Sequence, residues 1–241
     1  MRIIENVKIA LDTYKMVLQP TRSEIEKLKA LVPGQFINIK IEGFYLRRPI
    51  SIADWNDESL TIIYKVVGKG TQALSELDPG IKLDILWPLG NGYNLTWIPN
   101  SAILIGGGVG VPPMYGLAKK LVEEGKKPRI ILGFRDKNQV FYDDEFRKLG
   151  LEVTVYTEDG SYGEKGFVTN GFDQAEYVCA CGPERMLEAI YHKAQDGQYS
   201  FEARMACGFG GCMGCSCETL VGNKRICKEG PVLVHKELLW Q

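Results

Sequence analysis

Hydrophobic and polar residues follow two different rhythms along this chain of 241 residues. Residues 1–97 contain short apolar runs that are separated by Gly, Pro, Asp and Asn, as in VPGQ, DWNDES and LDPGIK. The runs are VKIAL, QFINIKI, RRPISIA, LTIIYKVVG and KLDILWPLG. Many short strands without long helices predict an antiparallel barrel or sandwich.

The rhythm changes near residue 101, where strand-like and helix-like segments begin to alternate. The expected strands are AILIGGG, RIILGFR, EVTVYTEDG and EYVCACG, and the expected helices are PPMYGLAKKLVEEG, YDDEFRKLG and PERMLEAIYHKA. Leu117 and Leu121 share one face of the first helix. This alternation predicts a parallel sheet with helices on its faces. From residue 201 the chain is rich in Gly and Cys, so we expect domains at 1–97, 98–200 and 201–241.

Composition narrows the function classes. The net charge is −1, which does not suggest nucleic acid or an anionic membrane as a partner. The beginning of the chain resembles a first strand more than a signal peptide, and no apolar run is long enough to cross a bilayer. We therefore expect a cytoplasmic enzyme or subunit. In a reducing compartment, the clustered cysteines indicate metal or redox chemistry rather than disulfides.

A glycine-rich loop follows the first strand of the α/β region. Gly106, Gly107, Gly108 and Gly110 lie between AILI and a helix that begins near two prolines. Glycines let the backbone approach a pyrophosphate, and a helix N-terminus offers free N–H groups. The spacing is G-x-G-x-G and not the usual G-x-G-x-x-G. We favour a phosphate site, and the alternative is a tight turn that binds no ligand.

Two further segments of this region carry candidate residues for a nicotinamide nucleotide. Cys181, Gly182 and Pro183 follow a strand, where open α/β sheets bind ligands, so Cys181 is a possible neighbour of a nicotinamide ring. Its alternative role is that of a small buried residue. Glu158 and Asp159 follow the third strand, and carboxylates near a ribose favour NAD over NADP. Alternatively, both are turn residues.

The first region contains weaker signals. In LRRPISI, Arg48 can pair with a phosphate and Ser51 offers a hydroxyl. Alternation along a strand would place Arg48 and Ile50 on one side, and Pro49 and Ser51 on the other. In VGKGT, the glycines free the backbone and Thr71 can donate to a phosphate.

The cysteine-rich segment carries the strongest motif. Cys207, Cys212 and Cys215 have the C-x4-C-x2-C spacing of plant-type [2Fe–2S] ligands, and Cys227 supplies a fourth. Zinc is the main alternative, although structural zinc sites usually contain two C-x2-C pairs. Cys217 is surplus to the motif, and we interpret it as a packing thiol that is not a ligand.

Taken together, R-P-x-S, G-K-G-T, PLGNGY, GGGVGVPP and CGPERML resemble the ferredoxin–NAD(P) reductase superfamily. The resemblance covers residues 1 to about 197. It implies an N-terminal antiparallel flavin-binding β-barrel and a parallel α/β nucleotide-binding domain, here followed by a small [2Fe–2S] module. It also implies that FAD is bound by Arg48, Pro49, Ile50, Ser51, Ile63, Tyr64, Lys65, Gly70 and Thr71.

The whole cysteine-rich tail narrows the resemblance to the electron-transfer subunits of NAD-dependent (class 1B) dihydroorotate dehydrogenases. This implies a relay that takes electrons from the FMN of a catalytic partner subunit, through [2Fe–2S] and FAD, to NAD⁺ in UMP biosynthesis. It further implies an α2β2 heterotetramer in which dihydroorotate oxidation requires the partner, whereas NADH oxidation by an artificial acceptor does not. Two alternatives stay open: a subunit of a transhydrogenase or sulfhydrogenase complex, and a zinc- and nucleotide-binding regulatory module.

Overall fold

The computed structural model describes residues 1–240, and its first region is a curved antiparallel sheet with strand order β1-β2-β5-β4-β3-β6. Hydrogen bonds between Ile3 and residues 80–81, just before β6, bring the two ends of the sheet together. The predicted barrel is therefore nearly closed. Its elements are β1 (Arg2–Ala10), β2 (Thr13–Gln19), α1 (Ile25–Lys29), β3 (Phe36–Ile39), β4 (Arg48–Trp55), β5 (Leu60–Lys65), α2 (Lys69–Ser75) and β6 (Ile85–Leu89).

The second region is a seven-stranded sheet of order β10-β9-β8-β7-β11-β12-β15, in which all pairs are parallel except β12 with β15. The predicted parallel α/β architecture is confirmed, and Leu117 and Leu121 are fully buried on α3. The elements are β7 (Ile103–Gly107), α3 (Val111–Glu123), β8 (Arg129–Phe134), α4 (Asp143–Lys148), β9 (Val153–Thr157), β10 (Glu164–Lys165), β11 (Ala175–Cys181), α5 (Glu184–Tyr191), β12 (Ala194–Ser200) and β15 (Val232–Val234).

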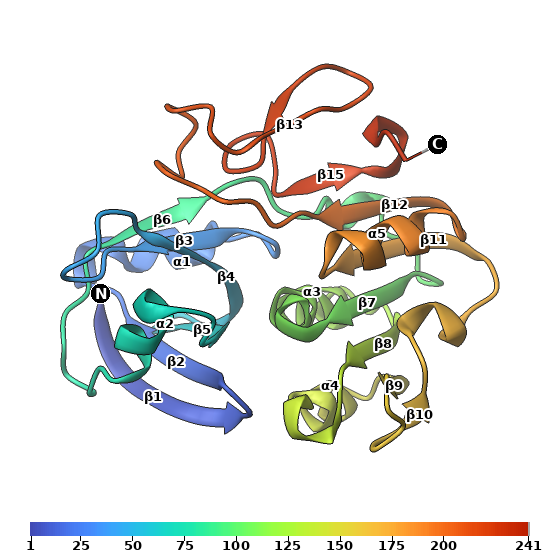
Figure 1. Cartoon of the computed structure of the whole chain (residues 1–241), viewed down its shortest axis with the longest axis horizontal. Coiled ribbons are helices and arrows are strands. Elements are labelled where there is room, and N and C mark those ends of the chain that lie inside the picture. Colours follow the sequence, from blue (N-terminus) through green and yellow to red (C-terminus); the bar gives the residue numbers. More distant parts are fainter. Residues whose placement is uncertain (241) are drawn as a thin grey trace.

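The C-terminal segment lies across the top of both regions in Figure 1, with the small ribbon of β13 (Ser216–Cys217) and β14 (Lys224–Arg225) above them. Strand β15 returns from this segment to the edge of the seven-stranded sheet. The division at residue 201 stays a prediction, and the structure shows that the last segment is tied to the second region by a strand.

Three hydrophobic clusters form the core, and two of them join the regions. One fills the barrel interior. A second joins the barrel to α3, where Ala53 of β4 packs with Met114 and Leu117. A third joins Phe36 of β3 to Cys215 and Cys227 of the C-terminal segment. Because burial of each large apolar side chain contributes roughly 1.5–3 kcal/mol, these shared clusters fix the three regions against one another. Within residues 1–240, we find no helix of the length and apolarity needed to cross a membrane.

Candidate functional site

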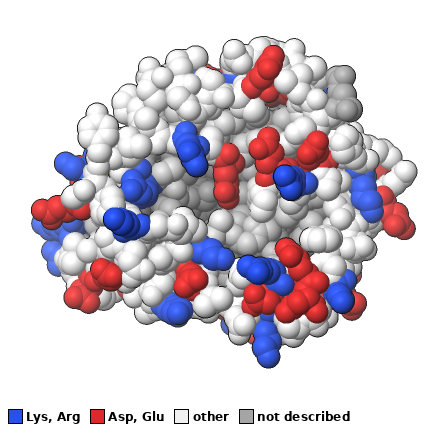
Figure 2. All heavy atoms as spheres, in the orientation of Figure 1, with Lys and Arg blue, Asp and Glu red and all other residues white. Residues whose placement is uncertain are grey.

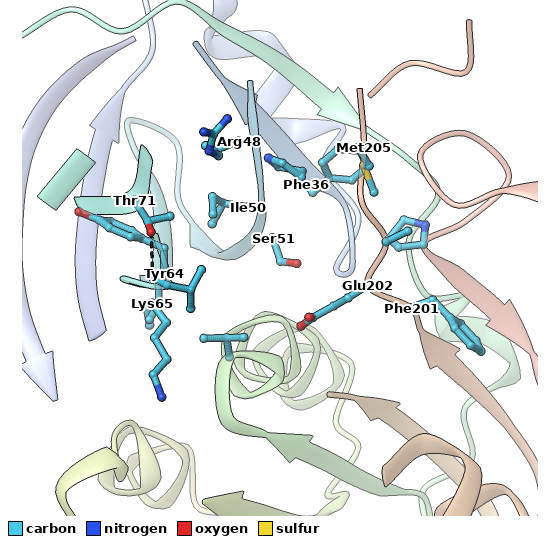
Figure 3. A pocket seen from close by; sticks show the side chains of 16 residues that line it. Phe36, Arg48, Ile50, Ser51, Tyr64, Lys65, Thr71, Phe201, Glu202 and Met205 are labelled. Atoms are coloured by element: carbon cyan, nitrogen blue, oxygen red, sulfur yellow. Dashed lines mark hydrogen bonds between the residues drawn. The ribbon is translucent and has the colours of Figure 1, made fainter. Parts of the chain in front are cut away.

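A cavity of about 320 Å³ opens where β4 and β5 separate. The first half of β4 pairs with β3 and its second half pairs with β5, so the Arg48–Ser51 segment leaves space toward the end of β5. Figure 3 shows side chains of both strands around this space. The lining contains all the residues predicted for FAD except Gly70, namely Arg48, Pro49, Ile50, Ser51, Ile63, Tyr64, Lys65 and Thr71.

The alternation expected along β4 is present in its register. Ile50 lies opposite Ile37 of the barrel core, whereas Ser51 lies opposite Phe36, which packs on the C-terminal segment. Nevertheless all four residues from Arg48 to Ser51 border the cavity, because it follows the edge of the strand and not one of its faces. An elongated aromatic ligand such as a flavin fits a site whose wall is a strand edge with apolar side chains on both sides.

Arg48 and the beginning of α2 form the cationic end of this cavity. The Arg48 guanidinium lies over Gly70, where a Cβ would be only 2.5 Å from Nε of Arg48. The guanidinium carbon is also 5.1 Å from the ring centroid of Phe44. The Thr71 hydroxyl donates to the Gly68 carbonyl at 3.1 Å and accepts from the Val67 N–H at 2.9 Å. Its proton therefore closes the turn before α2, so Arg48 is the group that supplies positive charge for a phosphate.

The polar ends of Tyr64 and Lys65 are engaged with other side chains and do not join Arg48 in binding a phosphate. The Tyr64 hydroxyl donates to Oδ1 of Asn6 at 2.9 Å, and burial raises its pKa well above the ordinary range. The Lys65 ammonium donates to Oε1 of Gln139 at 2.9 Å. Gln139 belongs to the second region of the chain and lines a further cavity there, so Lys65 links the barrel to that region.

The other side of the first cavity comes from residues that the sequence patterns did not single out: Val109, Phe201, Glu202, Ala203, Met205 and Pro231. Figure 3 shows Glu202 and Ser51 extending into the space between the barrel and the nucleotide-binding domain. The Glu202 side chain keeps contact with solvent through the cavity mouth, yet the surrounding protein buries the carboxylate enough to raise its pKa. FEARM carries no motif that would have identified this residue before the fold was known.

A second cavity of about 490 Å³ lies at the carboxyl ends of β7, β8 and β9, beside α5. Four of the residues predicted for NAD line it: Gly107, Gly108, Glu158 and Pro183. Arg135 and Arg185 also line it and were missed. Arg135 directly follows β8 and Arg185 lies in the first turn of α5, both at the edge of the sheet where ligands bind, and each can pair with a phosphate.

The glycine loop divides into two functions. A Cβ on Gly110 would lie 2.1 Å from the carbonyl oxygen of Cys181, so this glycine permits close packing of the loop on β11. Gly106 likewise packs against the backbone of Val111. Gly107 and Gly108, in contrast, border the nucleotide cavity, and Val109 borders the flavin cavity. One loop, Gly107–Val109, is therefore a wall shared by both cavities.

The remaining NAD candidates lie outside the cavity lining. Oδ1 of Asp159 accepts from the N–H and hydroxyl of Ser161 at 2.9 and 2.6 Å, and these bonds lower its pKa, as the alternative turn role requires. Cys181 is 3% exposed within the hydrophobic core, and burial raises the pKa of its thiol to about 12. Gly182 follows Cys181 and packs on Met186 of α5.

The four predicted cluster ligands lie near one another as two pairs. Cys207 and Cys212 interact through their thiols, and so do Cys215 and Cys227. Within residues 1–240, no three His, Cys, Asp or Glu side chains converge on a single point. A tetrahedral zinc site needs four ligands around one ion, whereas a [2Fe–2S] cluster distributes four cysteines over two irons. Four cysteines near one another in two pairs suit a binuclear cluster in which each pair would bind one iron.

Backbone N–H groups surround the sulfurs as an anionic cluster requires. Gly211 donates to Sγ of Cys207 at 3.2 Å, and the N–H of Cys227 donates to Sγ of Cys215 at 3.4 Å. Burial opposes ionisation of Cys207, but N–H donors including those of Phe209 and Gly211 outweigh it and lower its pKa to about 6. The thiolate, which is the iron-binding form, is thus favoured at the first ligand position.

Cys217 has a different environment. It belongs to β13, opposite Lys224, and its thiol donates to the carbonyl of Glu218 at 3.5 Å. Burial and the carboxylates of Glu184 and Glu218 raise its pKa. This placement in the β13–β14 ribbon, with the thiol on the carbonyl of Glu218, supports the interpretation of Cys217 as a non-ligand.

The surface seen in Figure 2 is hollowed between the barrel and the nucleotide-binding domain, and Lys, Arg, Asp and Glu surround the hollow. The top of this face, over the C-terminal segment, shows few charged side chains. Phe209 and Met213, which flank the cluster cysteines, are 60% and 53% exposed. An exposed apolar surface beside a redox centre is typical of a protein contact.

Comparisons with known proteins agree with this geometry. Residues 104–192 match the oxidoreductase NAD-binding domain family, and residues 202–239 match the family described as the iron-sulfur cluster binding domain of dihydroorotate dehydrogenase B. The chain is 43% identical to the "Dihydroorotate dehydrogenase B (NAD(+)), electron transfer subunit" of Fusobacterium nucleatum, over 97% of this chain and 95% of that protein. It is 38% identical to the Bacillus pumilus protein of the same name, over 98% and 96%.

Solved structures extend the comparison to the fold. A chain of an NADH-dependent reduced ferredoxin–NADP oxidoreductase superposes with a TM-score of 0.86 at 30% identity, covering 99% of this chain and 89% of that one. The cytochrome b5 reductase domain of Ulva prolifera nitrate reductase superposes with a TM-score of 0.65 at 19% identity, covering 80% and 90%. The second likeness concerns the fold alone.

Proposed function

The chain belongs to the family of dihydroorotate dehydrogenase B (NAD(+)) electron transfer subunits, and from that membership we propose its role in UMP biosynthesis. It passes electrons from the FMN of a dihydroorotate dehydrogenase catalytic subunit, through a [2Fe–2S] cluster and FAD, to NAD⁺. Dihydroorotate loses two electrons and two protons to give orotate. NAD⁺ gains two electrons and one proton, and the second proton goes to solvent.

The observation that carries the proposal is the shared wall formed by Gly107–Val109. One side of this loop lines the cavity that holds the residues predicted for FAD, and the other lines the cavity at the carboxyl ends of the parallel strands. When bound, the cluster carries single electrons and the flavin converts them into the hydride that nicotinamide accepts. Because the two cavities meet at this loop, groups bound in them can lie next to each other, as the transfer of a hydride requires.

The chain's own residues hold and orient the groups. We propose that Arg48 pairs with an FAD phosphate beside Gly70, and that Arg135 and Arg185 pair with the phosphates of the nucleotide. Glu158 accepts from a ribose hydroxyl and disfavours a 2′-phosphate, which supports NAD over NADP. Cys207, Cys212, Cys215 and Cys227 hold the cluster beneath the exposed Phe209 and Met213, where the partner's electrons enter. We further propose a cytoplasmic α2β2 heterotetramer and the domain division 1–97, 98–200 and 201–241.

The decisive experiment compares the isolated chain with the reconstituted complex. Under anaerobic conditions the purified chain should contain FAD, two irons and two sulfides per chain. It should oxidise NADH with an artificial acceptor but leave dihydroorotate unchanged until the catalytic subunit is added. A colourless protein, dihydroorotate oxidation by the isolated chain, or a preference for NADPH would each contradict the part of the proposal that it tests.

A second function is favoured by one observation. The likeness to the NADH-dependent ferredoxin–NADP oxidoreductase chain covers nearly the whole molecule, so the same scaffold can serve a transhydrogenase-type partner. Parallel reconstitution with a dihydroorotate dehydrogenase catalytic subunit and with a transhydrogenase partner subunit separates the two functions. We expect NAD⁺ reduction to couple to dihydroorotate oxidation and not to NADPH oxidation.

A further inference from the structure

A buried amide lies between the barrel and the cluster segment. Asn38 is 1% exposed on β3 and faces Pro49 in the register of β4, within the segment that lines the flavin cavity. Its neighbours Ile37 and Ile39 point into the barrel core. Because strand residues alternate between faces, Asn38 points outward with Phe36, toward the C-terminal segment.

The outward amide contacts the backbone of a predicted cluster ligand. Nδ2 of Asn38 donates to the carbonyl oxygen of Cys207 at 3.3 Å. The next residue, Gly208, has φ +79°, and a Cβ there would lie 2.3 Å from the same Nδ2. The loop backbone thus rests directly on the amide, and the residue type at 208 is matched to that contact.

The other end of the amide lacks a partner. Oδ1 of Asn38 is buried and makes no hydrogen bond with any group of residues 1–240. Leaving such a group unsatisfied costs roughly 1–3 kcal/mol, and an aliphatic side chain would avoid that cost. The side-chain hydrogen bond that Asn38 does make is the one to Cys207, and it accounts for a polar residue at this position.

We propose that Asn38 is a positioning residue that fixes the first cluster ligand, Cys207, to the strand lining the flavin cavity. Through this contact, the hydrogen bond adds to the packing that places the cluster segment and fixes Cys207 itself relative to the flavin cavity. The inference rests on the proposed function, in which Cys207 is a cluster ligand. It adds a residue from the barrel, 169 positions away in the chain, to the groups that determine electron transfer.

The test uses the full-length, cofactor-loaded chain and the variant Asn38→Leu, which removes the donor and the orphaned oxygen together. We expect hydrogen-exchange protection of residues 206–214 to fall about fivefold, the factor that one hydrogen bond of ~1 kcal/mol represents. The electron paramagnetic resonance spectrum of the reduced cluster should broaden or shift, and its midpoint potential should change. FAD content and the protection of β7 and β8 should stay at parent values.

Gln198→Leu is the matched control. Gln198 is also a buried amide, 1% exposed on β12, but it hydrogen-bonds the backbone of Asn94 at 2.7 and 3.1 Å, away from the cluster. The Gln198→Leu variant should loosen the segment around Asn94 and leave the electron paramagnetic resonance spectrum of the cluster unchanged. If Asn38→Leu does not fold, the smaller Asn38→Val also removes the donor and suits a strand, and the same shifts are expected.

The outcomes separate this inference from the function on which it rests. Folded Asn38 variants with the parent's spectrum, potential and loop protection would overturn the positioning role alone. A parent chain without iron and sulfide would overturn both.

Discussion

The nucleotide-binding sheet and the cluster segment adjoin through β12 and β15, but different forces hold their functional residues. In the sheet, the Gly107–Val109 loop is fixed by fully buried strands such as β7 and by backbone packing of Gly110 on Cys181. In the cluster segment, residues 206–229, the strands are the two-residue β13 and β14. Packing therefore shapes the first site without a ligand, whereas we expect the second to depend on the metal for much of its order.

Polar contacts help to hold the cluster segment, because this segment has only a small hydrophobic interior. The Arg225 guanidinium pairs with Glu229 and donates to the carbonyl of Gly210 at 2.7 Å. Arg225 lowers the pKa of Glu229 to about 2, so this ion pair persists down to strongly acidic pH. Such exposed pairs contribute little free energy individually, and the comparison therefore predicts that losing iron affects this segment far more than the sheet.

The largest effect should come from Cys212→Ser. Removing one of four thiolates should abolish the cluster's absorption and its electron paramagnetic resonance signal, while FAD remains bound in its separate cavity. Dihydroorotate-dependent NAD⁺ reduction by the complex should be lost. Cys217→Ser is the matched control, since its thiol faces Glu184 and Glu218, and it should retain iron and sulfide. Cluster loss in the control would contradict the ligand assignment.

Removing the cluster with a chelator tests the comparison directly. Hydrogen exchange of residues 206–229 should accelerate by orders of magnitude, because the metal-bound cysteines organise this segment. Exchange of β7, β8 and β11 should stay near the holo rate. Equal acceleration in both regions would show that the sheet also depends on the cluster.

Gly110→Ala disturbs the region that packing holds. The added methyl would lie 2.1 Å from the Cys181 carbonyl oxygen, so the loop must move, at a cost of about 1–3 kcal/mol in the free energy of unfolding. Chemical denaturation measures the change. Gly68→Ala is the control, because no atom lies within 4 Å of its added methyl and its φ is −179°. A stable Gly110→Ala protein would refute the packing role.

The smallest effect concerns Glu202. Burial raises its pKa, so the folded protein binds this proton more tightly than the unfolded chain, and stability falls as pH rises from the unfolded pKa through the folded one. Glu202→Gln should remove that fall in the flavin-free chain and stabilise it above this range by about 0.5 kcal/mol or less, since the side chain also meets solvent. Thermal melts at several pH values measure it. A stabilisation that is the same at pH 4 and pH 8 would contradict the explanation.

Local patterns predicted much of this fold because the relevant physics is local. Alternation, glycine punctuation and helical spacing located most of the strands and the helices α3, α4 and α5 of the second region. They missed β12, whose sequence AQDGQYS follows α5 so closely that PERMLEAIYHKA was interpreted as one helix. That helix ends at Tyr191, and Ala194 begins the strand. Pairing with β11 and β15 overrides the weak strand propensity of these polar residues.

By itself the sequence determined the chemistry of the ligands: four cysteines in a spacing that fits two irons, a glycine loop, and the R-P-x-S strand. Only the tertiary structure decided which residues share a site. It brought Glu202 to the flavin cavity, Arg135 and Arg185 to the nucleotide cavity, and Asn38 to Cys207, while it directed Asp159 into a turn. Motif spacing records covalent neighbours along one segment. Contacts between segments depend on how the sheets pack, and no local pattern encodes the distance in space between residues of different segments.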